Sequence, residues 1–295
     1  MRWRGITAVL MAAVMWALMT IFIRIFNENG LSAMEIVEIR ALGATILFFA
    51  ILLVQDRKKL YVKWRDLWCF FATGTIGVAF FNFCYFKTVE TTDIAVAAVL
   101  LYTAPVFVML FSAILFREKL QKRNWLQAGL AFLGCVLISG VFSQNRIISL
   151  TGFLVGLLSG IGYAFYTIFS KVAVQKGYAS LTIMAYTFLF ASVGGAFFSS
   201  FHNMKNYFVG TGAKGLLFCI IVSIVTTVLP NSLYTYGLRY IESSRAGMLT
   251  FVDPIAAMVF AFVYFGEKPP LMTLVGVGLI LFSLLEKNFE KKLPI

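Results

Sequence analysis

Two stretches of the chain follow the same plan: YTAPVFVMLFSAILFREKL at residues 102–120 and FVDPIAAMVFAFVYFGEKP at residues 251–269. Each has a proline inside an apolar run, Pro105 or Pro254, and each reaches a Glu-Lys pair thirteen residues later. A proline in a helix removes one amide donor and clashes with the carbonyl of the preceding turn. The two stretches therefore predict one kinked helix written twice, 149 positions apart, in a chain of two related halves.

The composition places the chain in a lipid bilayer. Hydrophobic residues make up 60% of it and charged residues 13%, with a mean hydropathy of +0.88. Soluble domains carry about 25% charged residues. Apolar runs recur at lengths near the ~20 residues that cross a bilayer as a helix. We expect an all-α integral membrane protein with ten transmembrane helices, at about residues 4–26, 33–54, 67–86, 94–116, 124–142, 150–172, 180–201, 215–237, 245–265 and 270–286.

The basic residues predict the orientation of these helices. With the N-terminus in the cytoplasm, 18 of the 25 Lys and Arg residues fall on the cytoplasmic side and 6 on the other, and only Arg40 lies well within a span. Because Lys and Arg accumulate in cytoplasmic loops, both termini are expected in the cytoplasm of a multi-pass cell-membrane protein, in a bacterial plasma membrane. The same bias accounts for the net charge of +12, so no nucleic-acid partner is expected.

Neither the cysteines nor the single histidine suggest a metal site. Cys69, Cys84, Cys135 and Cys219 lie in apolar runs without ligand spacing, and His202 stands alone in an expected loop. No GxxxxGK[ST] motif for phosphate binding occurs. We expect no metal and no cofactor.

A second match supports the division into halves. WALMTIFIR at residues 16–24 aligns with YAFYTIFSK at residues 163–171, 147 positions later. Five spans per half is an odd number, so the second half must enter the membrane from the opposite side. We expect two inverted five-helix repeats, at residues 1–147 and 148–295. Inverted repeats are typical of secondary transporters, whose substrate site lies near mid-membrane between the repeats.

At this point the chain resembles the drug/metabolite transporter superfamily, in its ten-span EamA family. The resemblance rests on Arg24 and Lys171 ending the first span of each half, on G-x-x-x-x-E from Gly30, on Arg40, and on the two Pro…Glu-Lys stretches. It implies an inverted-repeat carrier of small metabolites, more often an exporter. The chain departs from many relatives at Glu35, where they place a proline or a small residue.

Aromatic and polar side chains at helical spacing mark the expected substrate pocket. Such groups suit an organic metabolite, because rings stack and a few polar groups fix the orientation. Packing or interfacial anchoring is the alternative for each of them. The candidates are Trp16 and Thr20, their counterparts Tyr163 and Thr167, then Asn82, Tyr85, Tyr102, Asn231 and Tyr234.

Charged residues and prolines within the spans form a second group of candidates. Asp253 is the one acid near the bilayer centre, where a carboxylate is costly and indicates function; it would bind a substrate ammonium or take up a proton, with a structural hydrogen bond as the alternative. Pro105 and Pro254 are the expected hinges, with a packing kink as the alternative. Arg24, Arg40 and Glu38 are candidates for gating or for pairing between helices, and Glu35 is expected at the solvated interface.

These features favour a secondary transporter of small metabolites, such as amino acids or nucleobase-like compounds, that alternates access to a central cavity. A lipid or glycolipid flippase is the near alternative. A membrane-embedded enzyme would need a catalytic constellation, so a non-enzyme is expected. Gly152, Gly156 and Gly160 lie on one helix face and predict close helix packing. Gly129 and Gly134, or Gly276, are candidates for a similar contact, which would extend to a dimer if the chain is not a monomer.

Overall fold

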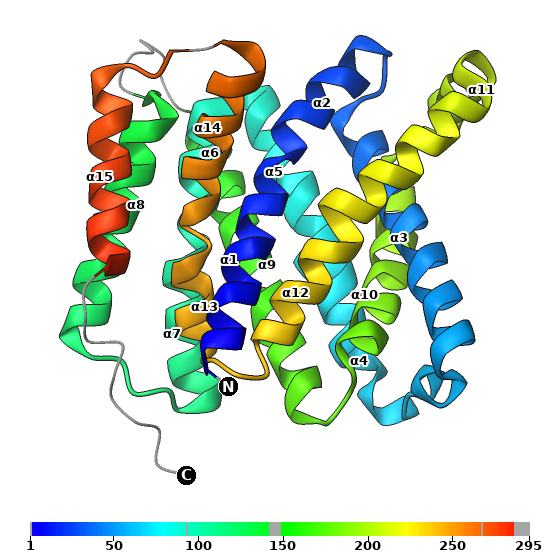
Figure 1. Ribbon diagram of the computed structural model, residues 1–295, viewed down its shortest axis with the longest axis horizontal. Helices are drawn as coiled ribbons and strands as arrows, with labels where there is room; N and C mark the ends of the chain where they lie inside the picture. Colours follow the sequence, from blue (N-terminus) through cyan, green and yellow to red (C-terminus); the bar gives the residue numbers. More distant parts are fainter. Residues whose placement is uncertain (1, 93, 142–148, 267, 286–295) are drawn as a thin grey trace.

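The computed structural model describes residues 2–92, 94–141, 149–266 and 268–285, and every regular element in these ranges is helical (Figure 1). Two short 3-10 turns, η1 (Arg57–Leu60) and η2 (Trp64–Asp66), precede α4. The helices of the first half are α1 (Arg2–Ala17), α2 (Met19–Glu28), α3 (Ala33–Gln55), α4 (Leu67–Phe71), the π-helical η3 (Ala72–Phe80), α5 (Phe81–Thr91), α6 (Ile94–Leu101), α7 (Ala104–Phe116) and α8 (Lys122–Ser139).

The second half repeats this order of elements. Both halves carry a π-helical segment in their third long helix and a break in their fourth. The elements are α9 (Leu150–Gln175), α10 (Ser180–Gly195), a 3-10 turn η5 (Ala196–Phe198), α11 (Phe201–Ser223), the π-helical η6 (Ile224–Val228), α12 (Leu229–Gly237), α13 (Ser243–Leu249), α14 (Val252–Phe265) and α15 (Leu271–Leu285).

Corresponding helices of the two halves run in opposite directions (Figure 1). In that view α1–α2, α4–η3–α5 and α8 rise, while α3 and α6–α7 descend. In the second half α9, α11–α12 and α15 descend, while α10 and α13–α14 rise.

The helix contacts have the same symmetry. α3 packs on its counterpart α10, and α8 packs on its counterpart α15. α1 packs on α12 and α14, and the equivalent helix α9 packs on η3–α5 and α7. Exchanging the two halves therefore leaves the main contacts of the fold unchanged.

Eight helical stretches of the described residues are long and apolar enough to cross a membrane. They are Arg2–Glu28, Ala33–Gln55, Trp64–Thr91, Ile94–Phe116, Leu150–Gln175, Ser180–Phe198, Phe201–Gly237 and Ser243–Phe265. The other two expected spans coincide with α8, which begins with two basic residues, and with the shorter apolar helix α15.

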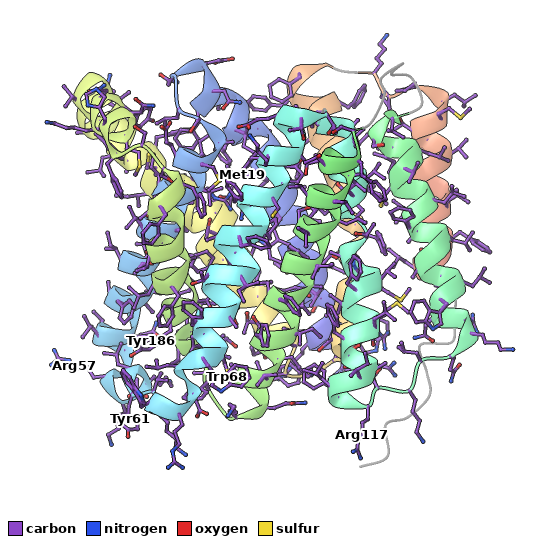
Figure 2. All side chains as sticks on the ribbon, turned by 180° about the vertical axis from the view of Figure 1, so that it is seen from behind. Met19, Arg57, Tyr61, Trp68, Arg117 and Tyr186 are labelled. Carbon is purple, nitrogen blue, oxygen red and sulfur yellow. The ribbon has the colours of Figure 1, made fainter. Side chains whose placement is uncertain are left out.

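One end of the molecule has the side chains of a membrane interface. Arg57, Tyr61, Trp68 and Arg117 lie at the same end, the lower one in Figure 2, where α1 also begins. Tyr61 is 76% exposed and Trp68 is 50% exposed. Trp and Tyr are enriched at membrane interfaces and basic residues flank them, so one boundary of the bilayer lies at this end.

Both prolines stand where a helix is interrupted. α6 ends at Leu101 and α7 starts at Ala104, with Pro105 in its first turn. α13 ends at Leu249, and Pro254 lies in the first turn of α14. Proline suits the first turn of a helix because its missing amide would have no partner there. The expected kinks are thus breaks between consecutive helices.

The helix expected at about residues 215–237 begins earlier, at Phe201. Ser200 Oγ accepts a hydrogen bond from the Asn203 amide at 3.4 Å and starts α11. Gly212 (φ 56°, ψ −143°) then interrupts it. The residues before Gly212 were expected to form a loop, so His202 lies in a first helical turn instead. This helix forms because Tyr207 has an apolar surface to pack against, with its ring centroid 6.0 Å from that of Phe26.

Gly134 and Gly276 bring α8 and α15 into close contact within one chain. A Cβ on Gly134 would lie 2.6 Å from the Gly276 carbonyl oxygen, and a Cβ on Gly276 would lie 2.5 Å from that of Gly134. Gly134 and Gly276 therefore contact one another within one chain. Gly129, the other glycine of α8, is exposed, and nothing lies within 4 Å of a Cβ there.

Gly134 and Gly129, both on α8, supply a matched test of helix packing. We expect Gly134→Ala to lower the free energy of unfolding by about 1–3 kcal/mol, because the added methyl group pushes two backbones apart. Gly129→Ala is expected to be neutral or to raise it by up to about 1 kcal/mol, since alanine favours helix. Thermal unfolding in detergent compares them, and equal destabilisation by both would contradict the packing.

Candidate functional site

A cavity of about 280 Å³ lies between the two halves and takes its walls from both. This volume is near the lower end of the ~300–1,000 Å³ of small-molecule pockets, and the mixture of rings and a few polar groups is typical of them. The sequence candidates that line it are Trp16, Asn82, Tyr85, Tyr102, Tyr163, Asn231, Asp253, Arg40 and Pro105. The side chains of Thr20 and Arg24 lie outside the described residues.

The cavity extends toward the end of the molecule opposite the start of α1. Ile23 near the end of α2, Ala33 at the start of α3 and Phe86 of α5 line it on that side. Met19, another lining residue, lies in the upper part of Figure 2, far from the interfacial residues Arg57 and Tyr61.

Tyr234 and the three side chains that it contacts form the floor of the cavity. Tyr234 is fully buried, and its hydroxyl lies 2.8 Å from Thr167 Oγ1. Its ring centroid lies 5.2 Å from that of Trp16 and 5.9 Å from that of Tyr166. Tyr234 and Thr167 therefore lie beneath the cavity and support its aromatic lining, although the sequence placed them among substrate contacts.

Below this floor, two charged side chains close the end of the bundle where α1 starts. Lys171 Nζ donates to the carbonyl oxygens of Leu238 and Ile241, at 2.5 and 2.8 Å. Glu118 accepts from the amides of Ser243 and Ser244, at 2.9 and 3.1 Å, and also from the Ser244 hydroxyl. These amides are the free donors of the first turn of α13, so Glu118 caps that helix and ties the end of α7 to it.

The helices that follow the two π-helical segments, α5 and α12, carry equivalent asparagines with different surroundings. Asn82 Nδ2 donates to the Val78 carbonyl at 2.8 Å, and Asn231 Nδ2 donates to the Thr227 carbonyl at 2.7 Å. Asn231 Oδ1 also accepts from the Tyr166 hydroxyl at 2.6 Å. Asn82 Oδ1 makes no hydrogen bond within the described ranges, so it is the amide oxygen that remains available to a ligand.

Arg40 is held from one side and lines the cavity on the other. Its Nε donates to Thr227 Oγ1 at 3.0 Å and its Nη2 to the Thr226 carbonyl at 3.1 Å. Both acceptors belong to η6, and π-helical segments release carbonyl groups from regular pairing. Arg40 therefore links α3 to η6, and it also lines the cavity.

Asp253 lies at the start of α14, directly after the break that follows α13. Its side chain lines the cavity and makes neither a hydrogen bond nor an ion pair with any residue in the described part of the chain. The neighbouring lining residues include Tyr102 and Tyr163. The acid singled out in the sequence therefore faces the cavity.

Two acids of α3 lie away from the cavity. Glu38 is 1% exposed and faces α10, where a Cβ on Gly195 would lie 2.4 Å from its Oε2. Glu35 is 2% exposed rather than solvated as expected. It accepts from the Ser32 amide at 2.7 Å and from Asn203 Nδ2 at 2.8 Å. The start of α11 covers it, and that helix was expected to be a loop.

Several lining residues were missed, and Tyr166 had a usable signal. It lies three positions after Tyr163, on the same side of α9. Met19, Phe81, Phe86, Phe188 and Thr250 also line the cavity and carry no signal that separates them from ordinary apolar packing. Pro254 is buried and is not among the lining residues.

A two-half bundle of apolar helices around a cavity with polar groups defines the class as a multi-pass membrane transporter. The chain belongs to the EamA-like transporter family, whose model matches residues 3–140 and again residues 150–285. The resemblance seen in the sequence is thereby confirmed. Its relatives in bacteria indicate the plasma membrane as its location.

Named relatives carry the same description. An uncharacterized transporter of Archaeoglobus fulgidus is 30% identical over 95% of this chain and 95% of its own. The riboflavin transporter ImpX of Fusobacterium nucleatum is 26% identical over 96% of this chain and 97% of its own. A solved crystal structure at 16% identity superposes with a TM-score of 0.79 over 96% of each chain, which shows the fold alone.

Proposed function

We propose that the protein is a secondary transporter of small organic metabolites that works by alternating access. The observation that carries the proposal is the cavity: it lies between two halves of matching architecture and presents Arg40, Asp253 and Asn82 among aromatic rings. A transporter needs a site that both sides of the membrane can reach in turn. No group of three or more potential metal ligands occurs in the described ranges, and catalysis is not part of the proposal.

The proposed architecture is ten transmembrane helices in two inverted five-helix repeats, at residues 1–147 and 148–295, with both termini in the cytoplasm. The opposed helix directions and the exchangeable contacts support the inversion. The bias of Lys and Arg supports the orientation. The breaks before Pro105 and Pro254 are the proposed hinges, because rigid helices on either side can turn about them.

In this orientation the cavity faces the outside of the cell. Glu118, Lys171 and the layer around Tyr234 close the cytoplasmic side. The opposite state would open that layer and close the walls formed by Ile23, Ala33 and Phe86. Export is the proposed direction, as the family resemblance implies.

Amino acids and nucleobase-like compounds are the proposed substrates. Trp16, Tyr85, Phe86, Tyr102 and Tyr163 supply ring surface, and Asn82 supplies a free amide oxygen. One relative is named a riboflavin transporter, and riboflavin is a ring compound with polar edges. That name supports a planar polar substrate for this chain without choosing one.

The test is a thermal-stability screen of the purified protein against amino acids, nucleosides, bases, polyamines and lipids, followed by flux of each hit into proteoliposomes. A soluble metabolite that stabilises the protein and crosses the membrane through it supports the proposal. Transfer of lipid between leaflets without flux of any soluble compound would overturn it in favour of a flippase.

Proton coupling through Asp253 gives a second test. If its carboxylate releases the substrate when it takes up a proton, flux in proteoliposomes is expected to rise several-fold when a pH gradient is imposed. Asp253→Asn is expected to abolish that response, since an amide cannot titrate. Tyr102→Phe, which alters a neighbouring wall residue without removing a carboxylate, serves as the control. An undiminished pH response in Asp253→Asn would eliminate the coupling.

A further inference from the structure

Among the described residues, the lining of the cavity includes one cationic and one anionic side chain that do not neutralise one another. Arg40 stands on α3 of the first half and Asp253 on α14 of the second half. No ion pair joins them, and neither has a partner of opposite charge within hydrogen-bond or ion-pair distance in the described part of the chain. A charge removed from water is costly unless a partner compensates it.

Arg40 is oriented before any ligand arrives. Its Nε and Nη2 are bound to Thr227 and Thr226, while Nη1 makes no hydrogen bond within the described ranges. A planar guanidinium fixed on one edge presents its remaining donors to an anion in a set direction, and carboxylates match this geometry well. Glu38 lies two residues away on another face of α3, against Gly195, and does not compensate this charge.

Asp253 has the complementary arrangement. Its backbone amide is bound to the Thr250 carbonyl at 2.9 Å, while its carboxylate has no partner in the described part of the chain. The ring surfaces of Trp16, Tyr102 and Tyr163 lie along the same cavity. Aromatic faces attract cations, so these rings favour an ammonium group near the carboxylate.

We propose that the substrate is a dipolar ion, with its carboxylate bound by Arg40, its ammonium group bound by Asp253 and its apolar or aromatic body packed among the rings. The inference rests on the proposed transport function and narrows its substrates to zwitterionic amino acids or close analogues. A ligand with only one charge leaves one pole of the cavity uncompensated, and a neutral base leaves both.

A matched ligand series tests the inference on the unaltered chain. Tryptophan carries both charges, tryptamine lacks the carboxylate, and indole-3-propionate lacks the ammonium group. Binding to the purified protein is measured by thermal stabilisation. Tryptophan is expected to bind at least about tenfold more tightly than either analogue, because each analogue lacks one of the two charged hydrogen-bonded contacts. Phenylalanine, phenethylamine and 3-phenylpropionate repeat the series with a smaller ring. Equal affinity within both series would overturn the inference.

Two substitutions assign the poles. Arg40→Gln is expected to make tryptophan and tryptamine bind alike, and Asp253→Asn to make tryptophan and indole-3-propionate bind alike. Arg40→Lys keeps the charge without the guanidinium geometry and is expected to keep part of the preference, which separates the effect of charge from an effect on folding. Phe86→Leu, a wall residue without charge, is expected to weaken all three ligands by a similar factor. A preference that survives in both Arg40→Gln and Asp253→Asn contradicts the assignment.

The broader metabolite screen separates this inference from the proposed function. Flux of a nucleobase or a simple amine by the unaltered chain, without any preference for dipolar ions, overturns the inference and leaves transport intact. Absence of flux for every soluble compound overturns both.

Discussion

Tyr234→Ala is expected to lower the free energy of unfolding by about 3–5 kcal/mol, the cost of emptying a fully buried aromatic site. Tyr234 is 0% exposed and contacts the rings of Trp16 and Tyr166. Its loss removes the hydrogen bond to Thr167 as well. Because this side chain lies directly beneath the cavity, the void would also weaken the closed side of the bundle.

Two controls make the result specific. Tyr234→Phe keeps the ring and is expected to cost only about 1 kcal/mol, the value of one hydrogen bond. Tyr85→Ala removes the equivalent tyrosine of the other half, which faces the cavity, and is expected to cost clearly less than Tyr234→Ala. Thermal and denaturant unfolding in detergent measure all three. Equal losses at Tyr85 and Tyr234 would show that the floor is not packed as described.

Glu118→Ala is expected to produce the largest effect on conformation. The carboxylate of Glu118 caps the first turn of α13 through Ser243 and Ser244. Loss of a helix cap costs about 1–2 kcal/mol, and loss of a hydrogen bond to a charged group costs about 1.5–3 kcal/mol. We expect a loss of about 2–3 kcal/mol from the state in which this end of the bundle is closed. The population of the open state should then rise more than tenfold.

Cysteine labelling reads out this shift. Ser170 is 0% exposed and lies about one turn after Thr167 and directly before Lys171 on α9. In a background without the four native cysteines, labelling of Ser170→Cys from the side where α1 begins should accelerate when Glu118→Ala is added. Glu118→Gln retains an acceptor oxygen and should give a smaller increase. Glu90→Ala, at an exposed ion pair with Lys87, should leave labelling unchanged. Unaltered labelling in Glu118→Ala would refute the role of this cap.

Much of the fold follows from patterns that repeat along the chain. Apolar length predicted the helices, and the doubled proline stretches predicted kinks where the structure has breaks, between α6 and α7 and between α13 and α14. Asn82, Tyr85 and Asn231 face the cavity. They could be selected from the sequence because helical spacing shows which residues share a face. Spacing does not say what covers that face.

The features that the sequence did not predict have a common cause. Glu35, expected at the solvated interface, is covered by α11, and Glu38 faces Gly195 of α10. Both neighbours lie far along the chain. The helix at the start of α11 is stabilised by packing on Phe26, which local sequence does not reveal. Glu118 caps a helix 125 positions away, and no local pattern announces that partner.

The pair Tyr85 and Tyr234 shows a further limit. The two residues occupy equivalent positions in the repeats, yet Tyr85 lines the cavity and Tyr234 is buried below it. A chain with one open and one closed side must treat equivalent residues differently, because the two repeats face opposite ends. A sequence motif repeated in both halves therefore identifies a pair of positions without identifying which member touches the cavity in a given state.

Under the proposed alternating-access mechanism, the exchangeable contacts of the two halves determine what biases the transporter toward one state. A contact that has a counterpart in the other half is lost on one side and regained on the other when the states interchange, so it cancels from their free-energy difference. Only positions where the halves differ contribute to that difference. In the alignment of the two halves, Asp253 corresponds to Ala104, and Lys171 corresponds to Arg24. Under the proposed mechanism, the resting direction of the transporter is set by such unmatched positions and not by the bulk of its helix packing.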